Sequence, residues 1–113
     1  MSPESAPQDC TCLAGKFYFD DFEDRKLGMD RNLGEAELMT CKKCRRLWLR
    51  YYWENAAFTK SGRWYHGLVR EGDGNKLTAE NAPAYLAGLE WYLRGGSFYN
   101  GEVSRASGPL ILT

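Results

Sequence analysis

Four cysteines are the residues whose type and spacing point most directly to chemistry. They form two pairs, one with a single residue inside it and one with two, and 28 residues separate the pairs: Cys10 and Cys12, then Cys41 and Cys44. Two thiolate pairs at short spacing let each of two turns supply two ligands, which completes the tetrahedron of a structural zinc ion. Such a site uses all four thiolates and leaves no open position for a substrate. We therefore expect one structural zinc ion bound by four sulfur atoms.

The same cysteines admit other uses. Lys42 and Lys43 lie between Cys41 and Cys44, and adjacent cations lower a thiol pKa as redox chemistry requires, although no βαβ context of a thioredoxin-like site is visible. Four cysteines could also bind an iron–sulfur cluster, or remain free thiols. The chain starts without the basic and apolar segments of an export signal, so we expect a cytoplasmic protein whose thiols stay reduced.

Little in the sequence supports catalysis. The single histidine, His66, lies in an alternating aromatic segment, where packing is a more common role than a general base or a fifth metal ligand. The sequence has no nucleophile elbow, phosphate-binding loop, dinucleotide fingerprint or zinc-protease motif. The acidic run from Asp20 to Asp24 lacks the order of a calcium loop, and we expect it to be solvated. We therefore expect that the protein is not an enzyme.

Charge is balanced over the whole chain but not along it. The 113 residues carry 15 basic and 15 acidic side chains, so no overall field favours nucleic acid or an anionic membrane. Residues 1–40 carry four basic and nine acidic side chains, a net charge of −5, and residues 41–113 carry a net charge of +5. We expect the two stretches to face each other or solvent; the alternative is a basic recognition surface beside an acidic loop. No apolar run reaches the roughly 18 residues of a membrane span, so we expect no membrane partner.

Alternating side chains predict a small antiparallel sheet. Arg45–Glu54 and Arg63–Arg70 alternate with a period of two, and both faces of the first segment are large, which predicts a central strand. We expect another strand at Lys16–Phe22 and an edge strand at Pro109–Leu112. The long connection after Phe22 is expected to contain a short helical turn at Glu35–Met39.

One main helix is predicted near the C-terminus. Asn81 or Thr78 is the candidate N-cap, Pro83 suits the first turn and Gly95-Gly96 is the expected end. The buried stripe has three- and four-residue spacing and comprises Tyr85, Leu86, Leu89, Tyr92 and Leu93. We therefore expect an α+β fold, with residues 1–9 as a disordered tail and residues 10–113 as one zinc-binding domain.

The cysteine pattern carries a resemblance. Cys10-Thr-Cys12 with Cys41-Lys-Lys-Cys44, followed by a predicted strand, resembles the zinc-ribbon and treble-clef group of small zinc domains over about residues 10–54. The whole chain is similar to short bacterial proteins with such a site. The resemblance implies four ligands, a structural metal and no substrate. The sequence departs from the usual pattern in the first pair, where ribbons have two intervening residues, and at Arg45, where they have glycine.

The expected binding surface lies on the two long strands. If the helix covers one face of the sheet, no second helix covers the other, and aromatic and arginine side chains dominate protein interfaces. The candidate binding residues are Trp48, Arg50, Tyr52, Arg63 and Trp64. The competing interpretation is that most of these aromatic residues belong to the core.

These observations predict a non-catalytic, zinc-stabilised module that binds a protein partner or forms a homodimer. The alternative is a nucleic-acid-binding zinc domain. Between Cys41 and Arg70 the chain has eight basic residues and one acidic residue, interleaved with aromatic side chains, as in surfaces that stack bases and contact phosphates. If the acidic run covers these basic residues, protein binding gains support.

Overall fold

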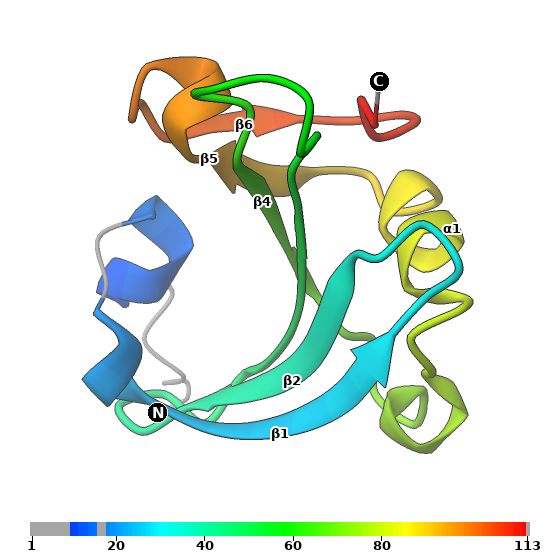
Figure 1. Cartoon of the computed structure of the whole chain (residues 1–113). Coiled ribbons are helices and arrows are strands. Elements are labelled where there is room, and N and C mark those ends of the chain that lie inside the picture. The colour runs from blue at the N-terminus through cyan, green and yellow to red at the C-terminus, as the bar shows by residue number, and fades with distance from the viewer. Residues whose placement is uncertain (1–9, 16–17, 113) are drawn as a thin grey trace.

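The fold is an antiparallel sheet of six strands in sequence order. The computed structural model describes residues 10–15 and 18–112. Each strand pairs with the next along the chain, and every pair is antiparallel. The strands are β1 (Phe22–Met29), β2 (Glu35–Cys41), β3 (Leu47–Trp53), β4 (Arg63–Leu68), β5 (Tyr92–Gly95) and β6 (Ser104–Ala106). Figure 1 shows that the sheet curves strongly, with the segment before β1 against its inner face and the helix α1 outside the curve.

The predicted main helix is wrong, and the fold is largely β rather than α+β. The only α-helix among the described residues, α1 (Ala82–Ala87), has six residues, with Pro83 in its first turn. It ends at Gly88, well before the predicted Gly95-Gly96. Tyr92 and Leu93 lie in β5, although both are buried. The apolar residues therefore have helical spacing because the residues before and after a turn are buried in the core, and not because they form one continuous helix.

The two long strands are confirmed. β3 and β4 lie within the predicted segments, and β3 has a neighbour on each side. The helical turn predicted at Glu35–Met39 is instead part of β2. The strand β1 was predicted as a connection, because most of its side chains are exposed at the sheet edge and no apolar alternation marks it.

The ends of the chain also differ from the prediction. Pro109–Leu112 is not a strand, and β6 is the second edge of the sheet. The predicted strand at Lys16–Phe22 lies partly outside the described residues, and its later part forms the 3-10 turn η2 (Phe19–Asp21). The predicted tail, residues 1–9, also lies outside them. No helix in the described part of the chain is long and apolar enough to cross a membrane.

Both faces of the sheet are covered, because side chains of β3 alternate between two buried clusters. On the outer face, Leu49 and Tyr51 belong to a cluster that includes Leu86 of α1. On the inner face, Trp48 belongs to a cluster that includes Phe22 and all four cysteines, Cys44 at its partly buried margin. The cysteine site is therefore part of the covering of the inner face.

Candidate metal centre

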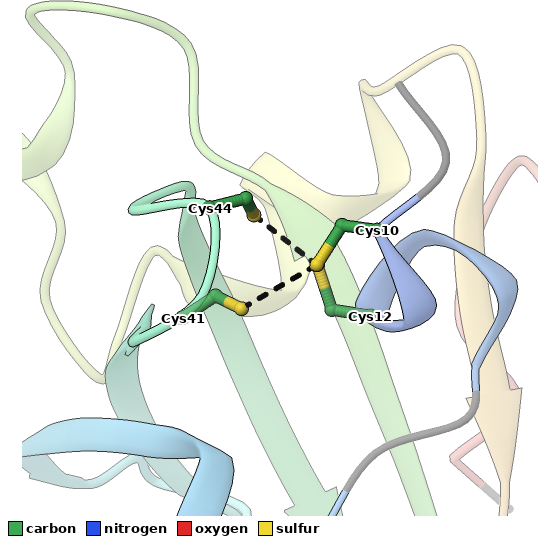
Figure 2. A group of neighbouring side chains, drawn as sticks. All are labelled: Cys10, Cys12, Cys41 and Cys44. Carbon is green, nitrogen blue, oxygen red and sulfur yellow. Dashed lines mark hydrogen bonds between the residues drawn. The ribbon is translucent and has the colours of Figure 1, made fainter. Parts of the chain in front are cut away.

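The four cysteines converge from two segments that are distant in sequence. Cys10 and Cys12 come from the start of the 3-10 turn η1 (Thr11–Ala14), Cys41 ends β2, and Cys44 lies in the turn to β3. All four Sγ atoms lie within 4.8 Å of one another. Figure 2 shows the two pairs pointing toward each other from opposite sides. The predicted set of ligands is therefore assembled in the folded chain.

The sulfur distances suit a single tetrahedral ion. Cys10 Sγ lies 3.8 Å from Cys41 Sγ, and Cys12 Sγ lies 3.6 Å from Cys44 Sγ. A tetrahedron with metal–sulfur bonds of about 2.3 Å has edges of about 3.8 Å. These separations are far longer than a disulfide bond of about 2.05 Å, and all four thiols are free. The site can thus hold a metal ion with little rearrangement.

A short turn places the first pair of thiols. The Leu13 N–H donates to the Cys10 carbonyl at 2.9 Å, and the Gly15 N–H donates to the Cys12 carbonyl at 3.2 Å. Gly15 has a φ of +77°, the left-handed conformation that glycine adopts without steric cost, and it ends the turn. Both side chains are buried. Cys10 precedes the turn with an extended backbone (ψ of 139°) and Cys12 lies within the turn, so the chain changes direction between the two thiols.

The second pair lies at the β2–β3 turn. The Cys41 N–H donates to the Arg46 carbonyl at 2.9 Å, and the Arg45 N–H donates to the Cys41 carbonyl at 2.8 Å. Arg45 has a φ of +66°. This is the left-handed conformation that glycine adopts without steric cost, so the turn uses it with a less suitable residue. Cys44 is the least buried of the four cysteines.

The acidic run faces the basic turn, as one of the two charge hypotheses predicted. Lys43 Nζ lies 3.9 Å from an Asp21 carboxylate oxygen, and Arg45 Nη1 lies 3.8 Å from a Glu23 carboxylate oxygen. Lys43 Nζ also donates to Thr11 Oγ1 at 3.4 Å, which joins the two cysteine-bearing segments. The sequence signal for this support was the pairing of an acidic run with a basic turn. Exposed ion pairs of this kind contribute little stability each.

The thiol pKa values differ around the site. Burial raises the pKa of Cys10 and of Cys12. Burial also acts to raise the pKa of Cys44, but hydrogen bonds from the Arg46 backbone and side chain outweigh it and lower that pKa to about 7. Metal ligation requires thiolates, so a bound cation would stabilise the charged form that burial disfavours at Cys10 and Cys12.

The five predicted binding residues do not form one exposed patch. Trp48 and Arg63 are fully buried, whereas Arg50, Tyr52 and Trp64 are half-buried. Arg63 points to the outer side of the sheet, where its guanidinium stacks 3.5 Å from the Phe98 ring centroid. The inner face that was expected to be uncovered is covered by the segment before β1. That these residues contact a partner stays a prediction.

His66 is a packed side chain. It is buried on the inner face, and its ring centroid lies 5.0 Å from that of Trp64 and 5.9 Å from that of Trp48. Burial, with a further contribution from the charge of Arg50, lowers the pKa of His66 to about 3. In the described part of the chain, the group of possible metal ligands around the site consists of the four cysteines.

Comparison with protein-family models, with curated proteins and with solved structures found no match to this chain. The zinc-ribbon resemblance therefore depends on the cysteine geometry alone.

Proposed function

We propose that the chain is a non-catalytic, zinc-stabilised module that binds a protein partner. The observation that carries the metal part is the convergence of four thiols, all within 4.8 Å, from segments 28 residues apart. A closed set of four sulfur ligands is typical of structural zinc sites. An iron–sulfur cluster places several iron and sulfide atoms between its cysteines and needs a wider cage.

The ion would act by attaching the first segment to the sheet. The turn η1 contacts the inner-face cluster through Cys12, and the same cluster contains Met39 and Trp48. Without a metal, the loss of four ligand bonds would favour detachment of this turn. A structural zinc ion contributes about 10–16 kcal/mol in small zinc peptides, enough to decide whether such a segment is ordered. A reducing cytoplasm, the proposed location, would keep the thiols available.

The charge geometry favours a protein partner over nucleic acid. Three of the basic residues in the 41–70 segment pair with carboxylates, at 3.9 Å for Lys43, 3.8 Å for Arg45 and 3.5 Å for Arg50, and a fourth, Arg63, is buried. Nucleic-acid binding depends on cations that can reach phosphates. Large apolar side chains are exposed instead, as protein contacts require: Tyr18, Met29, Leu33, Phe58, Phe98, Val103 and Ile111.

Elemental analysis of the purified chain tests the metal part. We expect one zinc ion per chain after purification without added metal. Less than about 0.2 metal ions per chain, together with four titratable thiols, would overturn the proposal. One iron ion per chain would show that the bound metal is iron and not zinc. Titration with single-stranded DNA and RNA tests the partner class, and tight, salt-sensitive binding would favour the nucleic-acid alternative.

A further inference from the structure

Leu33, at the tip of the β1–β2 hairpin, combines an exposed apolar side chain with an unfavourable backbone conformation. Its side chain is 73% exposed and its φ is +67°. Left-handed positions in hairpin turns normally hold glycine or asparagine, because other L-residues clash there. Single exposed leucines are common, but a leucine that is both exposed and strained requires a reason.

Hydrogen bonds hold the backbone of the turn that carries Leu33. Asp30 is buried, and its carboxylate accepts hydrogen bonds from the Asn32 N–H at 3.1 Å, the Gly34 N–H at 2.9 Å and the Tyr51 hydroxyl at 2.8 Å. A side chain at position 34 would collide with the Tyr51 ring, so only glycine fits. Because the backbone that carries Leu33 is fixed in this way, its side chain can bind without the cost of ordering the loop, which is the property of an interface anchor.

The surroundings of Leu33 are mainly acidic. Glu35 follows it by two residues and is exposed, and Glu54 follows Trp53, whose indole N–H donates to the Asn32 carbonyl at 2.8 Å. Glu80 lies 3.3 Å from Arg31 Nε in an exposed ion pair. These three carboxylates outnumber Arg31, so the hairpin tip and its neighbours carry net negative charge, which suits an apolar hollow with basic residues in its lining.

The same chain has such a hollow at the other end of β3. This depression of about 390 Å³ has half-buried aliphatic side chains in it, Leu47, Leu68 and Val69, and two basic residues, Arg46 and Arg70. The remaining lining residues are Glu71, Gly72 and Gly74. The anchor lies beside the last residue of β3 and the hollow beside the first, about 20 Å apart along the strand. One copy cannot fill its own hollow with its own Leu33.

We propose that a second copy of this chain occupies this hollow, with Leu33 of one copy inserted between Arg46 and Arg70 of the next. The inference rests on the proposed function as a protein-binding module and names its partner. Because the two surfaces differ, the contact is head-to-tail, and each added copy leaves one anchor and one hollow free. The assembly therefore grows with concentration instead of stopping at a dimer.

Sedimentation velocity of the full zinc-loaded chain tests the proposal with two variants. Leu33→Asn removes the anchor and suits the left-handed backbone, and Arg70→Glu reverses a charge at the hollow. We expect the average mass of the wild type to rise with concentration and each variant alone to stay monomeric. An equimolar mixture of the two should form a dimer that does not grow, because only one intact anchor and one intact hollow meet.

Three results would overturn the proposal: a wild type that is monomeric at every concentration, a Leu33→Asn variant that assembles like the wild type, or a mixture that remains monomeric. Lys60→Asn is the matched control, since Lys60 is also exposed with a φ of +55° but lies on another loop. This control should assemble normally. Zinc content is measured in parallel. A chain without metal would contradict the proposed zinc-stabilised module, whereas a zinc-loaded chain that does not assemble would contradict only the proposed assembly.

Discussion

At the scale of single residues, the left-handed backbone of Arg45 shows how the cysteine turn is built. Left-handed positions in tight turns usually hold glycine, and here an arginine with a φ of +66° follows Cys44. Its side chain is exposed and reaches Glu23 at 3.8 Å, a contact that contributes little. The position therefore tolerates arginine at a conformational cost that the rest of the turn must offset.

Replacing this arginine by glycine should stabilise the chain. Arg45→Gly relieves a clash of about 1–2 kcal/mol, part of which is offset by the greater freedom of glycine in the unfolded state. We expect a net gain of about 1 kcal/mol, measured by urea unfolding of the zinc-loaded protein. Lys42→Gly in the same turn is the control and should lose about 0.5–1 kcal/mol, since Lys42 is exposed and is not left-handed. A loss of stability in Arg45→Gly would contradict this view of the turn.

His66 should make stability depend on pH. Its folded pKa of about 3 lies below the unfolded value of about 6.5, so the unfolded chain binds the proton more readily. Neutral His66 therefore makes its full contribution to the free energy of unfolding above about pH 6.5, and this contribution is lost as the pH falls from 6.5 toward 3. At pH 5 the loss is about 2 kcal/mol.

Acid also releases zinc, but it does so in the wild type and in His66→Phe alike. The difference between the two proteins therefore gives the pH dependence that arises from His66. Urea unfolding at pH 7 and pH 5 should show the wild type losing about 2 kcal/mol more than the variant. Equal losses in the two proteins would mean that His66 is protonated in the folded state.

At the scale of elements, strands with large side chains on both faces were predicted correctly from the sequence. Strands without such side chains were not. β3 and β4 were found because large side chains alternate on both faces and the strands are interior. β1 was missed because it is an edge strand whose charged residues face solvent, and its sequence resembles a loop. The predicted helix was too long because three residues at helical spacing belong to one buried cluster, although the chain turns between α1 and β5. These residues are Leu86, Leu89 and Tyr92.

The candidate site was predictable in part for similar reasons. Cysteine type and spacing are visible directly in the sequence, so all four cysteines of the candidate site were predicted to come together, and they do. The burial of Trp48 was not predictable from its own segment, because it depends on where the segment carrying Cys10 and Cys12 packs. That segment is held in place by contacts between the two cysteine pairs, and the local sequence of neither pair indicates where it packs on the sheet.

The close packing of β4 against α1 gives a test at this scale. A Cβ at Gly67 would collide with Leu86 and Leu89 of the outer cluster. Gly67→Ala should therefore cost about 1–3 kcal/mol, as other overpacked cores do. The control is Gly88→Ala, where a Cβ would lie 3.6 Å from the nearest backbone oxygen and should cost little. Thermal unfolding that is unchanged by Gly67→Ala would contradict the described packing.

At the scale of the whole molecule, the proposed metal would join the segment carrying Cys10 and Cys12 to the sheet at the end of β2. Cys41→Ser removes one ligand at the end of β2. We expect loss of zinc, together with unfolding or with detachment of the segment that carries Cys10 and Cys12. Hydrogen exchange should become fast in that segment first, while β3 exchanges slowly if the sheet survives. An unchanged melting temperature would show that the site is not structural.

Zinc-edge X-ray absorption of the purified full chain shows directly which atoms bind the metal. We predict that four sulfur atoms surround the zinc ion at about 2.3 Å, with no nitrogen or oxygen neighbour. The distances of 3.6 Å and 3.8 Å between paired sulfur atoms already suit that arrangement. Fewer sulfur atoms around the ion, or a set completed by nitrogen or oxygen, would contradict this prediction.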